Sequence, residues 1–180
     1  MNDPRLPRTL YFVILLMGLL QWVRVYPLLP ERMASHFSFD GTPNGWQSKE
    51  AFFTGMFVVI ATSAFVAFLI PLLMAFSPDN LINLPNKKYW LAPERREETY
   101  RFFGAQMGWF GCGLLFFLLN ATWQAIKVNL PHAERFNSQG MFQVLVGFLI
   151  LTMFWTIHLL RHFYAVPDFP PSSNREQGWK

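Results

Sequence analysis

The side chains of this sequence that could do chemistry are few, and the most distinctive is His36. Asp40 follows it by four residues, and His132 lies in a second polar segment. Imidazole and carboxylate groups are ligands of Zn²⁺, so an external metal site is one interpretation. The other acidic residues of these segments are Glu31, Glu50 and Glu134. Because no tight spacing motif links the set, we favour the simpler interpretation. In it, the imidazole of His36 bonds backbone groups and shapes its loop, and no metal is bound.

A second pair, His158 and His162, has the spacing of residues that share one helix face. Such a pair could bind haem or metal or transfer protons. No acidic partner lies in the adjoining apolar segment, however, and Arg161 stands between the two. We therefore favour histidines at a lipid headgroup boundary. A nucleophile–base motif and a phosphate-binding loop are not found, and Cys112 is the only cysteine, so we predict a non-catalytic protein without a cofactor.

The elements that must position these groups are long apolar segments. The chain is 52% hydrophobic and 14% charged, whereas soluble domains carry about 25% charged residues. A helix needs roughly 20 apolar residues to cross a bilayer. Four segments meet this length, if Arg24 at the end of the first reaches outward to the headgroups: residues 9–27, 51–77, 102–126 and 138–161. We predict an all-α fold, a four-helix integral membrane protein forming a single membrane domain over residues 1–180.

The basic residues predict the orientation of these helices, because short cytoplasmic loops carry more Lys and Arg than external ones. Ten of the 15 basic residues lie in the two terminal segments and the middle loop, and five lie in the other two loops. We therefore expect both termini and the middle loop in the cytoplasm of a bacterium, with the protein in its inner membrane. The basic residues are divided between the two sides of the membrane, which also argues against nucleic-acid binding. The expected partner is the lipid bilayer.

The loop between the first two helices, residues 26–49, is rich in residues with special backbone properties. Two prolines after the first helix hold the chain extended, and Asp40-Gly41 and Asn44-Gly45 are turn dipeptides. Ser48 can cap the second helix. We expect a structured outer loop rather than a bare linker.

This loop resembles the bacterial domain of unknown function DUF1648, found in SdpI-type immunity and signalling proteins. The residues that match its pattern are Pro27, Pro30, His36, Phe37, Gly41, Pro43, Trp46 and Lys49. Ala34 departs from it, since the family usually has Pro at that position. The resemblance covers roughly the first 70 residues. It implies an integral membrane protein that binds a peptide or another membrane protein.

The apolar segments themselves contain no acidic residue, which argues against an ion-coupled transporter. Gly104 and Gly108 have the spacing that lets a second helix approach closely, within the chain or from a partner. Our leading hypothesis is a module that senses, binds or gives immunity to an extracytoplasmic peptide or membrane partner through the matching residues. A membrane enzyme with a metal-assisted site at His36 and His132, and a small transporter subunit, stay open as alternatives.

Overall fold

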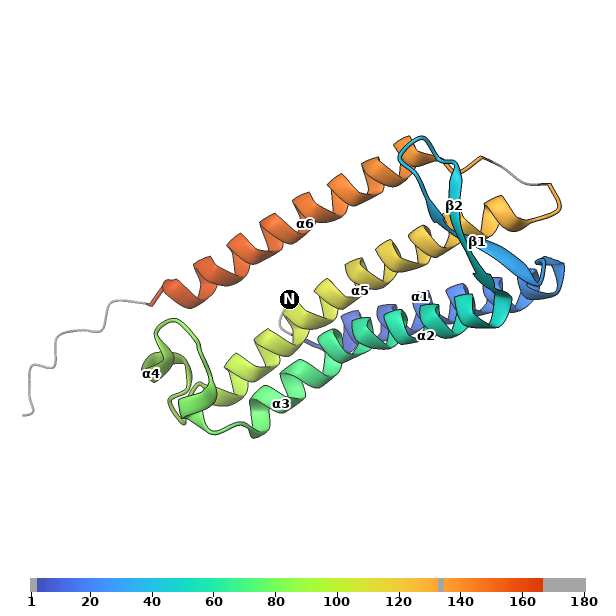
Figure 1. Ribbon diagram of the computed structural model, residues 1–180. Coiled ribbons are helices and arrows are strands. Elements are labelled where there is room, and N and C mark those ends of the chain that lie inside the picture. The colour runs from blue at the N-terminus through green and yellow to red at the C-terminus, as the bar shows by residue number, and fades with distance from the viewer. Residues whose placement is uncertain (1–2, 133–134, 167–180) are drawn as a thin grey trace, which may run out of the picture.

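The structure is a computed structural model that describes residues 3–132 and 135–166 of the chain. Its long helical segments run side by side (Figure 1). They are α1 (Arg5–Val25), α2 (Lys49–Ala64) with α3 (Ile70–Phe76), α5 (Arg96–Asn129) and α6 (Ser138–Tyr164). In the described residues, four helical segments are long and apolar enough to cross a membrane. We therefore describe the chain as a multi-pass membrane protein whose apolar helices contact lipid.

The helices are longer than the uncharged segments that predicted them. α5 begins at Arg96 and ends at Asn129, whereas the apolar segment covers residues 102–126. Helical hydrogen bonding continues through charged residues, which reach the headgroups or water at either end. α1 likewise begins at Arg5 and continues into a 3₁₀ turn, Tyr26–Leu28.

The all-α prediction needs one correction, in the loop between α1 and α2. This loop forms an antiparallel hairpin of β1 (Arg32–Phe37) and β2 (Pro43–Ser48). Its strands are six residues each and do not alternate apolar and polar side chains, which is the pattern that normally reveals a strand. The chain is mostly helical with one small two-stranded sheet.

The hairpin and the α5–α6 connection lie at one end of the helices (Figure 1). The connection from α3 to α5 lies at the other end and contains a 3₁₀ turn, Asp79–Leu81, and the short α4, Lys87–Trp90. The start of α1 and the end of α6 also point away from the hairpin. The beginning of α1, the end of α6 and the α3–α5 connection thus lie away from the hairpin.

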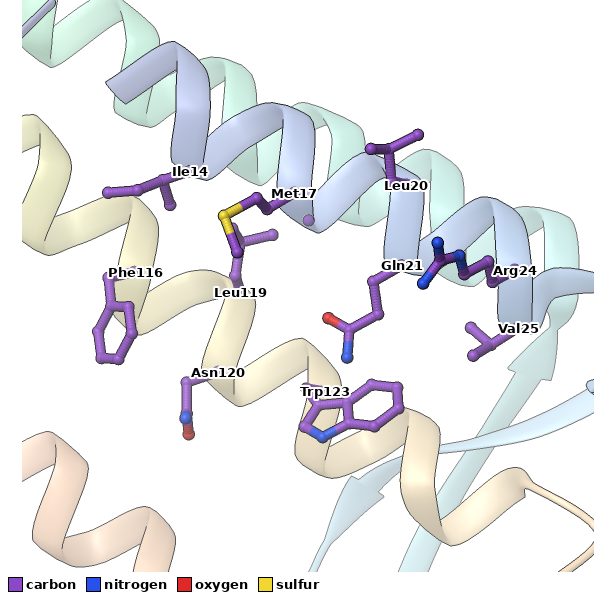
Figure 2. Close-up of a pocket in the computed structure, with 11 residues that line it drawn as sticks. Ile14, Met17, Leu20, Gln21, Arg24, Val25, Phe116, Leu119, Asn120 and Trp123 are labelled. Atoms are coloured by element: carbon purple, nitrogen blue, oxygen red, sulfur yellow. The ribbon is translucent and has the colours of Figure 1, made fainter. Parts of the chain in front are cut away.

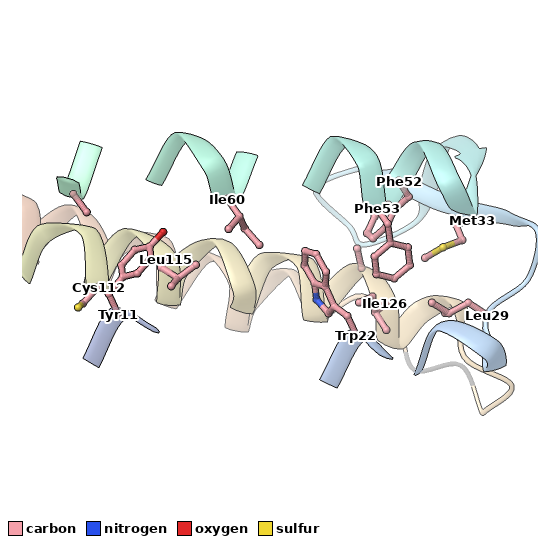
Figure 3. Close-up of a cluster of buried hydrophobic side chains, with 12 residues drawn as sticks. Tyr11, Trp22, Leu29, Met33, Phe52, Phe53, Ile60, Cys112, Leu115 and Ile126 are labelled. Carbon is pink, nitrogen blue, oxygen red and sulfur yellow. The ribbon is translucent and has the colours of Figure 1, made fainter. Parts of the chain in front are cut away.

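α1, α2 and α5 enclose the buried core, which runs the length of their contact (Figure 3). Toward the end of this core that lies away from the hairpin, the hydroxyl of Tyr11 lies 2.7 Å from that of Ser63. Ser63 donates its own hydrogen to the carbonyl of Ile60, so Tyr11 is the donor to Ser63. Tyr11 therefore satisfies its hydroxyl without contact with water.

A π-helical turn, Phe65–Leu69, joins α2 to α3. The amide of Ile70 bonds the carbonyl of Phe65, and the next residue, Pro71, has no amide hydrogen and would crowd a regular turn. The wider turn relieves this conflict. It also brings Ala67 against Gly111 of α5, where an added Cβ would lie 2.4 Å from the Cβ of Ala67.

The predicted packing glycines face helices of the same chain. A Cβ on Gly108 would lie 3.1 Å from the ring of Pro7 in α1, and one on Gly104 would make an ordinary contact of 3.9 Å with Pro71. The tightest approach is instead at Gly111, one turn further along α5.

α6 packs on α5, on the far side from α2 (Figure 1). Trp155 stacks on Phe110 at 4.7 Å between ring centroids and donates from its indole nitrogen to the carbonyl of Gln106. At the end of α6, the indole of Trp90 donates to the carbonyl of Phe163. α4 therefore caps the last turn of α6.

Candidate functional site

The base of the hairpin is built around Lys49, one of the motif residues. Its side chain donates to the carbonyl of Leu29 at 3.3 Å and to the carboxylate of Glu31 at 3.0 Å. The ammonium also lies 4.8 Å from the ring centroid of Tyr26, a cation–π distance. Lys49 is only 8% exposed, and burial of its ammonium requires these partners. This arrangement gives Lys49 a structural role where β2 becomes α2.

The remaining residues at the base direct the chain into and out of the hairpin. The prediction that Pro27 holds the chain extended is wrong, because Pro27 lies in the 3₁₀ turn and the chain becomes extended only at Leu29. Pro30 follows, and both prolines are exposed. The hydroxyl of Ser48 accepts a hydrogen bond from the amide of Ala51 at 3.1 Å, so the predicted cap of α2 is present.

The middle of the hairpin is held by Asn129, the last residue of α5. Its carboxamide accepts a hydrogen bond from the amide of Ala34 at 2.8 Å and donates one to the carbonyl of Ala34 at 2.9 Å. A second donor bond to the carbonyl of Ala125 orients the group. The Asn129 side chain thus pairs with β1 as a neighbouring strand would. Sequence reasoning missed Asn129, because 95 residues separate it from Ala34 and no local pattern marks it.

The tip of the hairpin rests on the start of α6. Phe37 stacks on Phe136 with ring centroids 4.3 Å apart. Gly41 has a φ of +84°, and a Cβ there would lie 2.6 Å from the carbonyl oxygen of Phe136. Both the backbone conformation and the close approach therefore favour glycine at this motif position. Phe136 is a second residue that the sequence did not reveal.

Asp40 stabilises the turn itself. Its carboxylate accepts hydrogen bonds from the amide of Thr42 at 3.1 Å and from the hydroxyl of Thr42 at 2.8 Å. These bonds favour the ionised form, so they hold the pKa of Asp40 below its ordinary value. Asp40 is therefore engaged in shaping the loop.

His36 is exposed, and its ring lies over Gly45 on β2, where an added Cβ would come within 3.0 Å of the imidazole. Its Nδ1 is 3.1 Å from the hydroxyl of Ser35, so the partner found is a side chain rather than the expected backbone group. Glu134, one of the acids considered with it, lies outside the described residues. Among the residues that are described, no group of three His, Cys, Asp or Glu side chains could hold a metal ion.

The other histidine pair lies at the opposite end, among aromatic rings. His162 lies 3.7 Å from the ring centroid of Phe102 and 4.7 Å from that of Trp90. His158 is more distant, 6.3 Å from Phe102. The geometry gives His162 a packing role between α4, α5 and α6.

Two large aromatic side chains of the hairpin remain exposed. Phe39 at the tip is 90% exposed and the motif residue Trp46 is 53% exposed. Trp46 is paired with Ala34. Because the backbone polar groups of Ala34 point away from β2 toward Asn129, those of Trp46 point to the outer edge of β2. Pro43, the remaining motif residue, is exposed at the start of this strand.

Pro27 and Pro30 precede the hairpin, and the other six motif residues separate into two groups. His36, Phe37, Gly41 and Lys49 hold the hairpin, whereas Pro43 and Trp46 lie on its exposed strand. The hairpin can offer an aromatic surface and a free strand edge on a firmly held support.

Comparison with curated proteins and with solved structures found no significant match for this chain. A family model does match, over residues 12–62, and its description is a domain of unknown function. The matched segment covers most of α1, the whole hairpin and most of α2. Asn129 and Phe136, which hold the hairpin, lie outside it. Residues 12–62 therefore carry the domain of unknown function DUF1648, the family that the loop motif predicted.

Proposed function

We propose that this chain is a non-catalytic protein of the bacterial inner membrane that senses, binds or gives immunity to an extracytoplasmic peptide or another membrane protein. The hairpin is its binding surface. The observation that carries this proposal is that the hairpin is anchored at its base, middle and tip, yet exposes Phe39, Trp46 and the edge of β2.

Anchoring favours recognition, because a preorganised surface loses little conformational entropy on binding. Tryptophan is among the residues that contribute most binding energy at protein interfaces. An open strand edge can pair with an extended peptide, which supplies main-chain hydrogen bonds. We therefore propose that the ligand binds in an extended form beside β2 and covers Trp46.

The proposed orientation places the hairpin outside the cell and both termini in the cytoplasm. The excess of basic residues on the side of the termini and of α4 supports it. The association of the loop motif with SdpI-type proteins supports a role in immunity or signalling. A reporter enzyme inserted after Phe39 tests the orientation, and activity of a cytoplasm-specific reporter there would overturn it.

Photo-crosslinking in cells tests the binding surface. A photoreactive phenylalanine analogue replaces Phe39 or Trp46, and the matched control replaces Phe76, which is 81% exposed at the opposite end. We expect one and the same peptide or protein, identified by mass spectrometry, to be crosslinked at positions 39 and 46 and not at 76. The adduct should be lost in the double variant carrying Asn129→Leu, which releases the hairpin from α5. Equal crosslinking at all three positions, or adducts with lipid alone, would refute the proposal.

A further inference from the structure

A groove lies between α1 and α5, apart from the hairpin (Figure 2). Its volume is about 660 Å³, within the range of about 300–1,000 Å³ usual for ligand sites. Met17, Phe116 and Leu119 form its apolar part, and Gln21, Asn120 and Arg24 give it a polar side.

The groove lies within one half of the bilayer. It extends along α1 from Ile14 to Val25, a rise of about 16 Å at about 1.5 Å per residue. This is about half of the roughly 30 Å hydrocarbon core. Arg24 is in the last turn of α1, so the charged end of the groove faces the headgroups on the side of the hairpin.

A polar side chain of α1 points into this groove. The amide of Gln21 points from α1 into the space beside α5 (Figure 2). The Oδ1 atom of Asn120 is buried and has no hydrogen-bond partner among the described residues. Polar groups within membrane helices usually face a partner or a cavity that accommodates them. Gln21 faces the groove, whereas the buried Oδ1 of Asn120 is closed off from it.

Arg24 supplies the charge. It is exposed and has no ion pair within the part of the chain that the structure describes. A guanidinium group at the membrane boundary is suited to bidentate hydrogen bonding with a phosphate. The lipid of the surrounding leaflet carries such a phosphate at this depth, joined to an acyl chain that fits the apolar part of the groove.

We propose that the groove binds one anionic phospholipid, with an acyl chain along Met17 and Leu119 and its phosphate on Arg24. Charge complementarity selects an anionic headgroup, since the groove contains a cation and no carboxylate. Gln21 supplies hydrogen-bonding groups for the glycerol and ester region. This site is independent of any ligand of the hairpin.

Native mass spectrometry of the full chain tests the proposal. The protein is released from detergent micelles that contain phosphatidylglycerol or phosphatidylcholine with identical acyl chains. Arg24→Gln removes the charge, and Arg32→Gln removes an exposed arginine of β1 as the matched control. Met17→Trp fills the groove, and Val23→Trp adds the same bulk at an exposed position of α1 that does not line it.

We expect one retained phosphatidylglycerol on the wild type and on both controls, and weaker retention of phosphatidylcholine. Arg24→Gln should weaken retention of phosphatidylglycerol roughly tenfold, the loss typical of a charge-assisted hydrogen bond, and Met17→Trp should abolish it. Gel filtration checks that each variant is folded. If Met17→Trp does not fold, comparison of Arg24→Gln with Arg32→Gln still tests whether the groove binds the lipid. Equal losses for Arg24→Gln and Arg32→Gln, or no preference between the lipids, would overturn the proposal and indicate ordinary lipid association.

Discussion

Removal of the Asn129 side chain should release the hairpin from α5 while the helices stay packed. Asn129→Leu keeps the size of the side chain but deletes both hydrogen bonds to the backbone of Ala34. Ala34 is 5% exposed, so its polar groups regain water only when the hairpin lifts away. Each such bond contributes about 0.5–1.5 kcal/mol. The free energy of hairpin docking should therefore fall by about 1–3 kcal/mol.

Hydrogen–deuterium exchange measures this change at the Ala34 amide. When exchange follows the opening equilibrium, a loss of about 1–3 kcal/mol accelerates it roughly 5- to 150-fold, since about 1.4 kcal/mol is a factor of ten. Amides in the middle of α5 should exchange as in the wild type. Asn120→Leu is the matched control, because it makes the same change on α5 without touching the hairpin.

An exchange rate at Ala34 within twofold of the wild type would refute this reasoning. It would mean that the ion pair of Lys49 and the stacking of Phe37 on Phe136 hold the hairpin without Asn129. Equal acceleration in the Asn120→Leu variant would also refute it, because the effect would then be a general loss of stability.

Two further predictions concern close packing and pH. Gly111→Ala should lower the free energy of unfolding in detergent by about 1–3 kcal/mol through overpacking against Ala67. The control Gly147→Ala, with nothing within 4 Å of the added Cβ, should raise that free energy by up to about 1 kcal/mol. A Gly111→Ala variant as stable as the wild type would contradict the prediction. The folded pKa of Asp40 is lowered, so its ionised carboxylate stabilises the turn. This stabilisation is complete above the unfolded pKa of about 3.9 and is lost as pH falls through the lower folded pKa. The Thr42 amide resonance should report this loss on acidification, and an Asp40→Asn variant with the same pH response would exclude the carboxylate as its cause.

The helices could be predicted from the sequence because the cause of each is local. Three uncharged segments reach 25 residues or more, and the first reaches membrane length once Arg24 extends to the headgroups. Such segments have few alternatives in a membrane, where a helix satisfies its own backbone. The cap at Ser48 was predictable for the same reason, since it involves residues three positions apart. The helix ends were less predictable, because charged residues extend a helix without an apolar signal.

The hairpin was only partly visible in the sequence. Its turn was marked by Asp40-Gly41, and a short Gly-containing connection between two extended segments is a hairpin signal. The strands lacked alternation, because neither face of the sheet is uniformly buried. Support from α5 and from Phe136, rather than strand propensity, stabilises them.

The sequence alone determined that this chain has four membrane-length helices, an asymmetric distribution of positive charge and a DUF1648 motif at one end. These properties depend on neighbours in the chain and on the bilayer as solvent. Only the tertiary structure decided which motif residues are structural, because Lys49, Gly41 and Phe37 act through partners distant in sequence. It also decided that Trp46 stays exposed and that Arg24 faces a groove, since the exposure of a side chain depends on what the rest of the fold places beside it.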